Sequence, residues 1–192
     1  MRIAVDAMGG DHAPREIVRG AQAGLRFLGP DDELCLYGVA ETVEAECRAL
    51  GLVDRRVRVV SCTQHIEMNE PPVEALRHKR DASILRMAVG AGKGEVDALI
   101  SAGNTGAFAA ACQLKIGTVA GVSRPGIAVV LPSFAGPVLI CDVWANVAPK
   151  PHHLHDYAKM CTCYARAVLG IERPRVGLVS IGEEGAYGKW VV

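Results

Sequence analysis

Apolar and polar positions along the chain form two recurring patterns. Short, nearly continuous apolar runs predict buried strands, whereas longer stretches with helical apolar spacing predict helices. The predicted strands are residues 2–7, 33–38, 56–61, 96–101, 126–131, 137–143 and 175–181. The predicted helices are residues 14–28, 40–51, 71–79, 81–94, 105–117 and 150–170. Because strand and helix alternate repeatedly, the pattern indicates an α/β fold with a mostly parallel sheet covered on both faces.

One uncharged stretch, residues 126–141, is apolar enough to raise the question of a membrane span. It contains Pro132, Gly136 and Pro137 at its centre, and it is shorter than the ~20 residues that a spanning helix needs. We therefore expect a hairpin of buried strands here.

Composition narrows the class of protein. The chain has 192 residues, of which 50% are hydrophobic, so one domain over residues 1–192 is expected, within the usual range of about 100–200 residues. Lys plus Arg and Asp plus Glu both number 21. This balance argues against nucleic-acid binding and a polybasic membrane patch. Small-molecule or protein partners are expected.

Cysteine usage indicates the compartment. The seven cysteines are odd in number, scattered along the chain and partly inside apolar runs. No signal peptide precedes the first predicted strand. These features are typical of a reduced, cytoplasmic protein.

The loops that follow the predicted strands carry the candidate chemistry. In parallel α/β sheets, ligands bind beyond the carboxyl ends of the strands. Four such loops combine glycine or small residues with carboxylates, amides or a lysine: residues 6–14, 101–106, 142–151 and 181–189. Their composition would let backbone N–H groups approach a ligand closely.

The loop "SAGNTG", residues 101–106, opens a predicted helix. It has neither the lysine of a Walker A loop nor the spacing of a GxGxxG dinucleotide turn. The unpaired N–H groups of a helix start could cradle a phosphate or an acyl oxygen. Alternatively, Asn104 or Thr105 caps the helix.

The loop "DAMGGDHAP" places Asp6 at a strand end, followed by Gly9 and Gly10. Asp11 precedes His12 just ahead of a helix. Asp11 is either a helix cap or the partner of a proton-transferring histidine.

The segment "KPHHLH" raises the possibility of a metal site. Its histidines precede Cys161 and Cys163, but the spacing lacks the paired elements of a zinc site, so an amphipathic helix start is the preferred interpretation. Lys150 is either a phosphate partner or a solvated surface lysine.

Four strings together resemble the bacterial phosphate acyltransferase family, PlsX, also called acyl-[acyl carrier protein]:phosphate transacylase. They are "IAVDAMGGDHAP", "IEMNEPPVEALRHKRDAS", "VDALISAGNTGA" and "GIERPRVGLVSIGEE". The resemblance runs from residue 1 to about residue 184. It implies a three-layer α/β/α Rossmann-like fold, similar to phosphotransacetylases and isocitrate-dehydrogenase-like proteins, a homodimer, and no cofactor.

The resemblance also implies an activity. Family members transfer a fatty acyl group from acyl carrier protein to inorganic phosphate, and the acyl phosphate feeds a membrane-bound glycerol-3-phosphate acyltransferase in phospholipid synthesis. A cytoplasmic enzyme, peripheral at the inner face of the membrane and without nucleic-acid partners, is expected. The implied catalytic set is Asp6, Asp11, His12, Asn104, Asn146 and Lys150. The implied phosphate- and acyl-binding set is Gly9, Gly10, Ser101, Gly103, Thr105, Gly106 and Glu183.

This chain departs from the family pattern in two loops. Trp144 stands where the family has glycine, and Ala148–Pro149 replace Asp–Cys. Tyr187 takes a lysine position and Lys189 an asparagine position. Family members also continue beyond the position of Val192. An impaired relative that only binds acyl carrier protein or phosphate is therefore an alternative. A nucleotide-dependent oxidoreductase is a second one, although no GxGxxG turn supports it.

Overall fold

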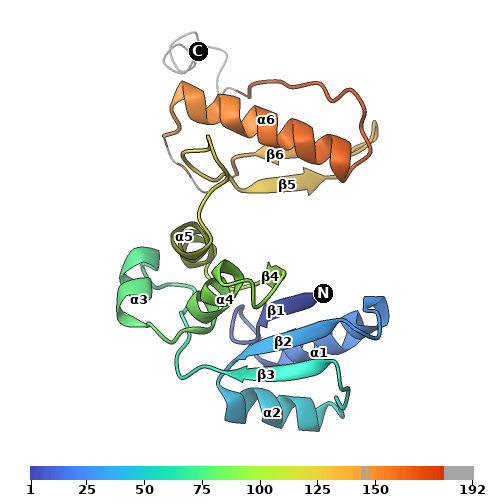
Figure 1. Cartoon of the computed structure of the whole chain (residues 1–192), viewed down its shortest axis with the longest axis vertical. Helices are drawn as coiled ribbons and strands as arrows, with labels where there is room; N and C mark the ends of the chain where they lie inside the picture. Colours follow the sequence, from blue (N-terminus) through green and yellow to red (C-terminus); the bar gives the residue numbers. More distant parts are fainter. Residues whose placement is uncertain (144–145, 147, 180–192) are drawn as a thin grey trace. The chain divides into compact units, whose positions relative to one another are not determined.

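The computed structural model describes residues 1–143, 146 and 148–179 (Figure 1). By its internal contacts the chain divides into two compact units, Met1–Gly117 and Thr118–Val192. We call them the first unit and the second unit. This division into compact units does not test whether residues 1–192 form a single domain, which stays a prediction.

The first unit is built on a four-stranded sheet with the strand order β3-β2-β1-β4. The strands are β1 (Arg2–Asp6), β2 (Glu33–Gly38), β3 (Val57–Ser61) and β4 (Ala98–Ile100). Every neighbouring pair is parallel, and the register places Val5 opposite both Leu36 and Ile100. The predicted parallel sheet is confirmed, and the carboxyl ends of β1 and β4 lie side by side.

Helices cover both faces of this sheet. They are α1 (Arg15–Gly24), α2 (Ala40–Ala49), α3 (Pro72–His78), α4 (Ser83–Gly92) and α5 (Thr105–Lys115), with a 3₁₀ turn, η1 (Leu25–Phe27), after α1. Side chains alternate along each strand, so Val5 and Leu36 pack with residues of α1 and α2, whereas Ala4 and Cys35 pack with Met87 of α4. Figure 1 shows α1 and α2 on one side of the sheet and α4 on the other. The three-layer α/β/α arrangement is confirmed.

A third apolar cluster joins α3, α4 and α5 beside the sheet. Small side chains, including Ala107 and Ala111 of α5, pack there with Leu76 of α3 and Leu85 of α4. This packing fixes the start of α5, where the "SAGNTG" loop ends.

The second unit contains β5 (Ala128–Leu131), β6 (Val138–Cys141) and α6 (Pro151–Ala167). β5 and β6 pair in antiparallel fashion, so the predicted hairpin is confirmed. The expectation that its strands are buried is wrong, because all four residues of β5 are exposed. Two strands have too little surface to bury two faces.

The predicted strand over residues 175–181 is wrong in its described part. Residues 175–179 form no strand, and Val179 is exposed over 85% of its surface. An apolar β-branched run marks the capacity to form a strand, but the strand forms only where a neighbour pairs with it. Among the described residues, no helix is both long enough and apolar enough to cross a membrane.

Candidate functional site

The loops that follow β1 and β4 meet around one buried carboxylate. Asp6, the last residue of β1, is only 1% exposed. Its Oδ2 accepts a hydrogen bond from the Ser101 hydroxyl at 2.8 Å, and its Oδ1 accepts from the Met8 N–H at 3.2 Å. The Ser101 Oγ in turn accepts from the Gly103 N–H at 3.0 Å. Asp6 therefore fixes both loops through one serine.

Glycines make this junction possible. A Cβ atom on Gly9 would lie 2.4 Å from Asp6 Oδ2 and 2.7 Å from the Gly103 nitrogen, closer than real Cβ contacts come. Gly10 has a φ of +107°, in the region that favours glycine, and it lies against Ala102. The structure thus brings together five of the predicted site residues: Asp6, Gly9, Gly10, Ser101 and Gly103.

Asn104 is the N-cap of α5, which confirms the capping interpretation. Its Oδ1 accepts from the Ala107 N–H at 3.0 Å. Its Nδ2 donates to the carbonyl oxygens of Glu67, Met68 and Glu70 at 3.2, 3.3 and 2.9 Å. With 6% exposure, this side chain is committed to partners within the protein.

Thr105 and Gly106 form the first turn of α5. Thr105 is exposed, and the N–H groups of a first helical turn are those that a helix cannot satisfy itself. A Cβ on Gly106 would lie 2.6 Å from Pro72 Cγ, so this glycine allows α3 to pack closely on α5. The first turn of α5 is therefore both accessible and firmly supported.

Asp11 and His12 lie elsewhere in the loop, with exposed side chains. The expectation that Asp11 caps the following helix is wrong, because α1 begins after Pro14 and has no side-chain cap. The proton-transfer interpretation of this pair stays a prediction.

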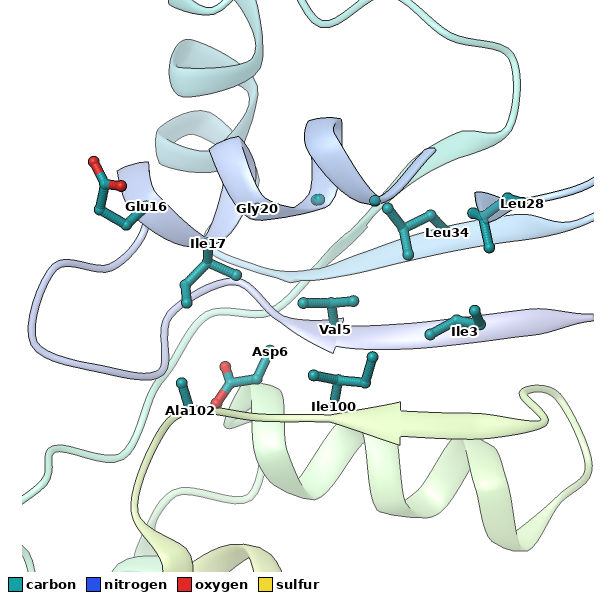
Figure 2. A pocket seen from close by; sticks show the side chains of 12 residues that line it. Ile3, Val5, Asp6, Glu16, Ile17, Gly20, Leu28, Leu34, Ile100 and Ala102 are labelled. Carbon is teal, nitrogen blue, oxygen red and sulfur yellow. The ribbon is translucent and has the colours of Figure 1, made fainter. Parts of the chain in front are cut away.

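An apolar groove of about 330 Å³ runs beside the Asp6 junction, between α1, β1 and β4 (Figure 2). Its lining is formed by Ile3, Val5, Asp6, Glu16, Ile17, Gly20, Ala21, Gly24, Leu28, Leu34, Ile100 and Ala102. Asp6 and Ala102 lie at one end and Ile3 and Leu28 at the other. Ile100 is 55% exposed here. This groove was not predicted from the sequence. The available signal was Gly20 and Gly24, which lie four residues apart on one face of a helix and leave space beside it.

Asn146 and Lys150 belong to the second unit. The Asn146 Nδ2 donates to the Pro125 carbonyl at 3.0 Å, to Asp142 Oδ2 at 2.8 Å and to the Tyr157 hydroxyl at 2.8 Å. This amide therefore ties the loop after β6 to α6. Burial raises the pKa of Tyr157, so its hydroxyl stays protonated near neutral pH.

Lys150 is exposed at the start of α6. Its backbone N–H donates to His153 Nδ1 at 3.0 Å, and burial lowers the pKa of His153. His153 thus acts as a neutral helix-start acceptor. Among the described residues, no group of three His, Cys, Asp or Glu side chains could hold a metal ion.

Several predicted positions lie outside the described residues. They are Trp144, Glu183, Tyr187 and Lys189.

The fold places the chain in a known structural class. It resembles a phosphotransacetylase from Streptococcus pyogenes with a TM-score of 0.65 and 20% identity, covering 97% of this chain and 60% of that one. The EutD phosphotransacetylase from Staphylococcus aureus gives a TM-score of 0.64 at 16% identity, covering 96% of this chain and 58% of that one. At these identities the likeness defines an α/β fold of the phosphotransacetylase type.

The sequence identifies the family within that class. The family described as "Fatty acid synthesis protein" matches residues 1–192, and the chain belongs to it. Proteins named phosphate acyltransferase are 47% identical in Desulfitobacterium hafniense (strain DSM 10664 / DCB-2) and 43% identical in Geobacillus sp. (strain WCH70), each over 98% of this chain. The chain spans 55% and 56% of the length of these two relatives. The resemblance indicated by the sequence motifs is confirmed.

Proposed function

We propose that this chain is an acyltransferase that moves a fatty acyl group from the thioester of acyl carrier protein to inorganic phosphate, giving an acyl phosphate. The observation that carries the proposal is the junction of the glycine loops around Asp6, beside the accessible first turn of α5. Membership of a family whose relatives are named phosphate acyltransferase supports it.

The reaction needs an anion held next to a thioester. A phosphate oxygen forms a bond to the thioester carbonyl carbon, the C–S bond breaks with its electron pair on sulfur, and the thiolate takes a proton from solvent. Negative charge builds on the carbonyl oxygen, so fixed N–H donors stabilise the transition state. Losing one such donor in acyl transfer costs about 100–1000-fold in rate.

We assign the roles as follows. The N–H groups of Gly10, Thr105 and Gly106, with the Thr105 hydroxyl, hold phosphate or the acyl oxygen. The Gly103 N–H already donates to the Ser101 hydroxyl oxygen, so Gly103 supports the loop and does not contact the anion. Because the Ser101 proton is directed at Asp6, Ser101 and Asp6 shape the loops together with Gly9. Asn104 belongs to the same loop. The roles that the family resemblance gives Asp11, His12, Asn146, Lys150 and Glu183 stay predictions. The Asn146 amide donates to acceptors within the second unit.

The wider setting follows the family. It comprises a homodimer in the cytoplasm, peripheral association with the membrane, and delivery of acyl phosphate to a membrane-bound glycerol-3-phosphate acyltransferase. The balance of 21 basic and 21 acidic residues argues against a purely electrostatic membrane contact.

A second candidate is a relative that binds acyl carrier protein or phosphate without turnover. Trp144 favours it, because an indole replaces a glycine of the family loop. Hydroxylamine trapping of acyl phosphate separates the two candidates, with a reaction lacking phosphate as the control. Phosphate-dependent hydroxamate supports the enzyme. Binding of acyl carrier protein without hydroxamate supports the second candidate, and product gained by Trp144→Gly would identify the indole as the block.

A further inference from the structure

The Asn104 amide joins two segments that are distant in the sequence. The three carbonyl oxygens that its Nδ2 contacts belong to residues 67–70, which are 34 to 37 positions away. An amide NH₂ group has two hydrogens, so these carbonyls already use its full donor capacity. The Oδ1 atom is occupied by the Ala107 N–H.

The turn over residues 67–70 is itself well ordered by hydrogen bonds. The Glu70 N–H donates to the Glu67 carbonyl at 3.3 Å, and the Glu67 N–H donates to Glu70 Oε1 at 2.8 Å. Lys79 forms an ion pair with Glu70 and donates to the His65 carbonyl at 2.9 Å. The Lys79 ammonium holds the pKa of Glu70 below its usual value, so the turn keeps its charged clasp near neutral pH.

The same turn leads directly into α3, which packs on the start of α5. Pro72, the first residue of α3, lies close enough to Gly106 that no Cβ fits between them. Two independent contacts, one through Asn104 and one through Pro72, therefore hold the 67–70 turn against the first turn of α5.

A ligand could engage the Asn104 amide only if the amide released these carbonyls. Asn104 is buried and its side chain has no spare donor or acceptor, so binding a ligand would break hydrogen bonds that the folded protein already makes. Direct phosphate binding by Asn104 would thus work against the packing seen in the structure.

We propose that Asn104 is a positioning residue. Its amide clamps the 67–70 turn onto the start of α5 and thereby fixes the direction of the Thr105 and Gly106 N–H groups, while the amide itself does not touch phosphate. On this proposal the segment "IEMNEP", residues 66–71 of the family motif, holds the start of α5 in place beside the anion site. This inference rests on the proposed function, in which those N–H groups hold phosphate.

The test separates the clamp from the helix cap. Asn104→Ser keeps an oxygen able to cap α5, since serine and asparagine are comparable N-caps, but it removes the NH₂ group. Asn69→Ser makes the same chemical change at an exposed position of the same turn and is the matched control. Each variant is compared with the wild type for thermal unfolding, amide hydrogen exchange at Glu67 and Glu70, phosphate binding, and the KM and kcat of phosphate-dependent acyl phosphate formation.

For Asn104→Ser we expect faster exchange at Glu67 and Glu70, a lowered melting temperature and about tenfold weaker phosphate binding, with a matching rise in the KM for phosphate. Asn69→Ser should leave all of these unchanged. Weaker phosphate binding without faster exchange would mean that Asn104 contacts phosphate directly, which overturns the proposal. Faster exchange with unchanged phosphate binding would reduce Asn104 to a structural role and also overturn it.

A second variant protects the test against misfolding of the first. Glu70→Gln is nearly isosteric and loosens the turn through Lys79 without changing the cap of α5. We expect faster exchange in the turn and about threefold weaker phosphate binding. A wild-type chain that neither binds phosphate nor forms acyl phosphate would contradict the proposed function instead, and the exchange comparison would still decide whether Asn104 clamps the turn.

Discussion

Adding a single methyl group at Gly9 should disrupt the junction between the loops after β1 and β4. In Gly9→Ala the new Cβ would lie 2.4 Å from Asp6 Oδ2, 2.7 Å from the Gly103 nitrogen and 2.9 Å from the Gly103 Cα. Two of these three atoms belong to backbone, and the third belongs to a buried carboxylate held by hydrogen bonds. The methyl group can be accommodated only if one loop moves.

The expected cost follows from this crowding. Inserting a methyl group into a well-packed site costs about 1–3 kcal/mol. Replacing glycine also restricts the unfolded chain, which offsets about 0.4–1 kcal/mol. The two ranges combine to a net loss of about 0–2.6 kcal/mol, and the midpoint of about 1.3 kcal/mol should lower the melting temperature by roughly 3–5 °C for a chain of this size.

The assay is thermal unfolding combined with hydrogen exchange of the β1 amides, which report on the first unit. Gly20→Ala is the control, because a Cβ at Gly20, inside α1, has no atom within 4 Å. That variant should gain up to about 1 kcal/mol from helix propensity. A Gly9→Ala protein as stable as the wild type, with unchanged exchange in β1, would refute the close junction of the two loops.

Three further predictions concern single groups. Ser101→Ala leaves the buried carboxylate of Asp6 without its hydroxyl donor and should destabilise the first unit by about 1–3 kcal/mol in thermal unfolding. An unchanged stability would contradict the role of Ser101 as the bridge between the two loops. Cys163 is exposed, whereas burial raises the pKa of Cys62 to about 11. Partial alkylation at pH 8, followed by mass spectrometry, should therefore find Cys163 modified before Cys62. Equal alkylation rates of the two cysteines would contradict the burial of Cys62. Hydrogen bonds from Arg56 lower the pKa of Asp54 from 3.8 to about 2. The charged carboxylate therefore contributes stability above the ordinary pKa, and this contribution is lost as the pH falls towards 2. Asp54→Asn should lower the melting temperature clearly at pH 6 and much less near pH 2, and an equal effect at both pH values would contradict this linkage.

Whereas the edge strands β3 and β4 are only partly buried, the central strands β1 and β2 could be predicted from the sequence because they are largely buried on both faces. Such strands are continuously apolar, as in residues 33–38, and glycine or polar residues mark where they stop. The run at 175–181 has the same local pattern, yet its described residues form no strand. Local pattern records what a segment prefers, whereas pairing depends on a neighbour that the segment itself does not encode.

The candidate site was predictable in position but less so in the task of each residue. Parallel strand order places the ends of neighbouring strands together, so Asp6 and Ser101 could be expected at one edge. Whether an asparagine binds a ligand or the backbone depends on carbonyls far away in the sequence. Asn104 and Asn146 both donate to such carbonyls, and only the folded structure reveals this.

The glycines carry a similar lesson. The sequence suggested that Gly9 and Gly103 admit a ligand to the backbone. In the structure the space at Gly9 is taken by Asp6 and by Gly103 itself, so these glycines first of all allow the two loops to touch. The anion site is therefore proposed at the accessible first turn of α5, next to the junction.

The most direct test of the central claim uses ¹⁸O-labelled inorganic phosphate with acyl carrier protein bearing a fatty acyl thioester. The relative from Desulfitobacterium hafniense serves as the positive control. The proposed reaction predicts acyl phosphate whose bridging oxygen carries the label, because a phosphate oxygen attacks the thioester carbon. Free fatty acid with oxygen from water, or no phosphate-dependent loss of thioester while the control turns over, would contradict acyl transfer to phosphate by this chain.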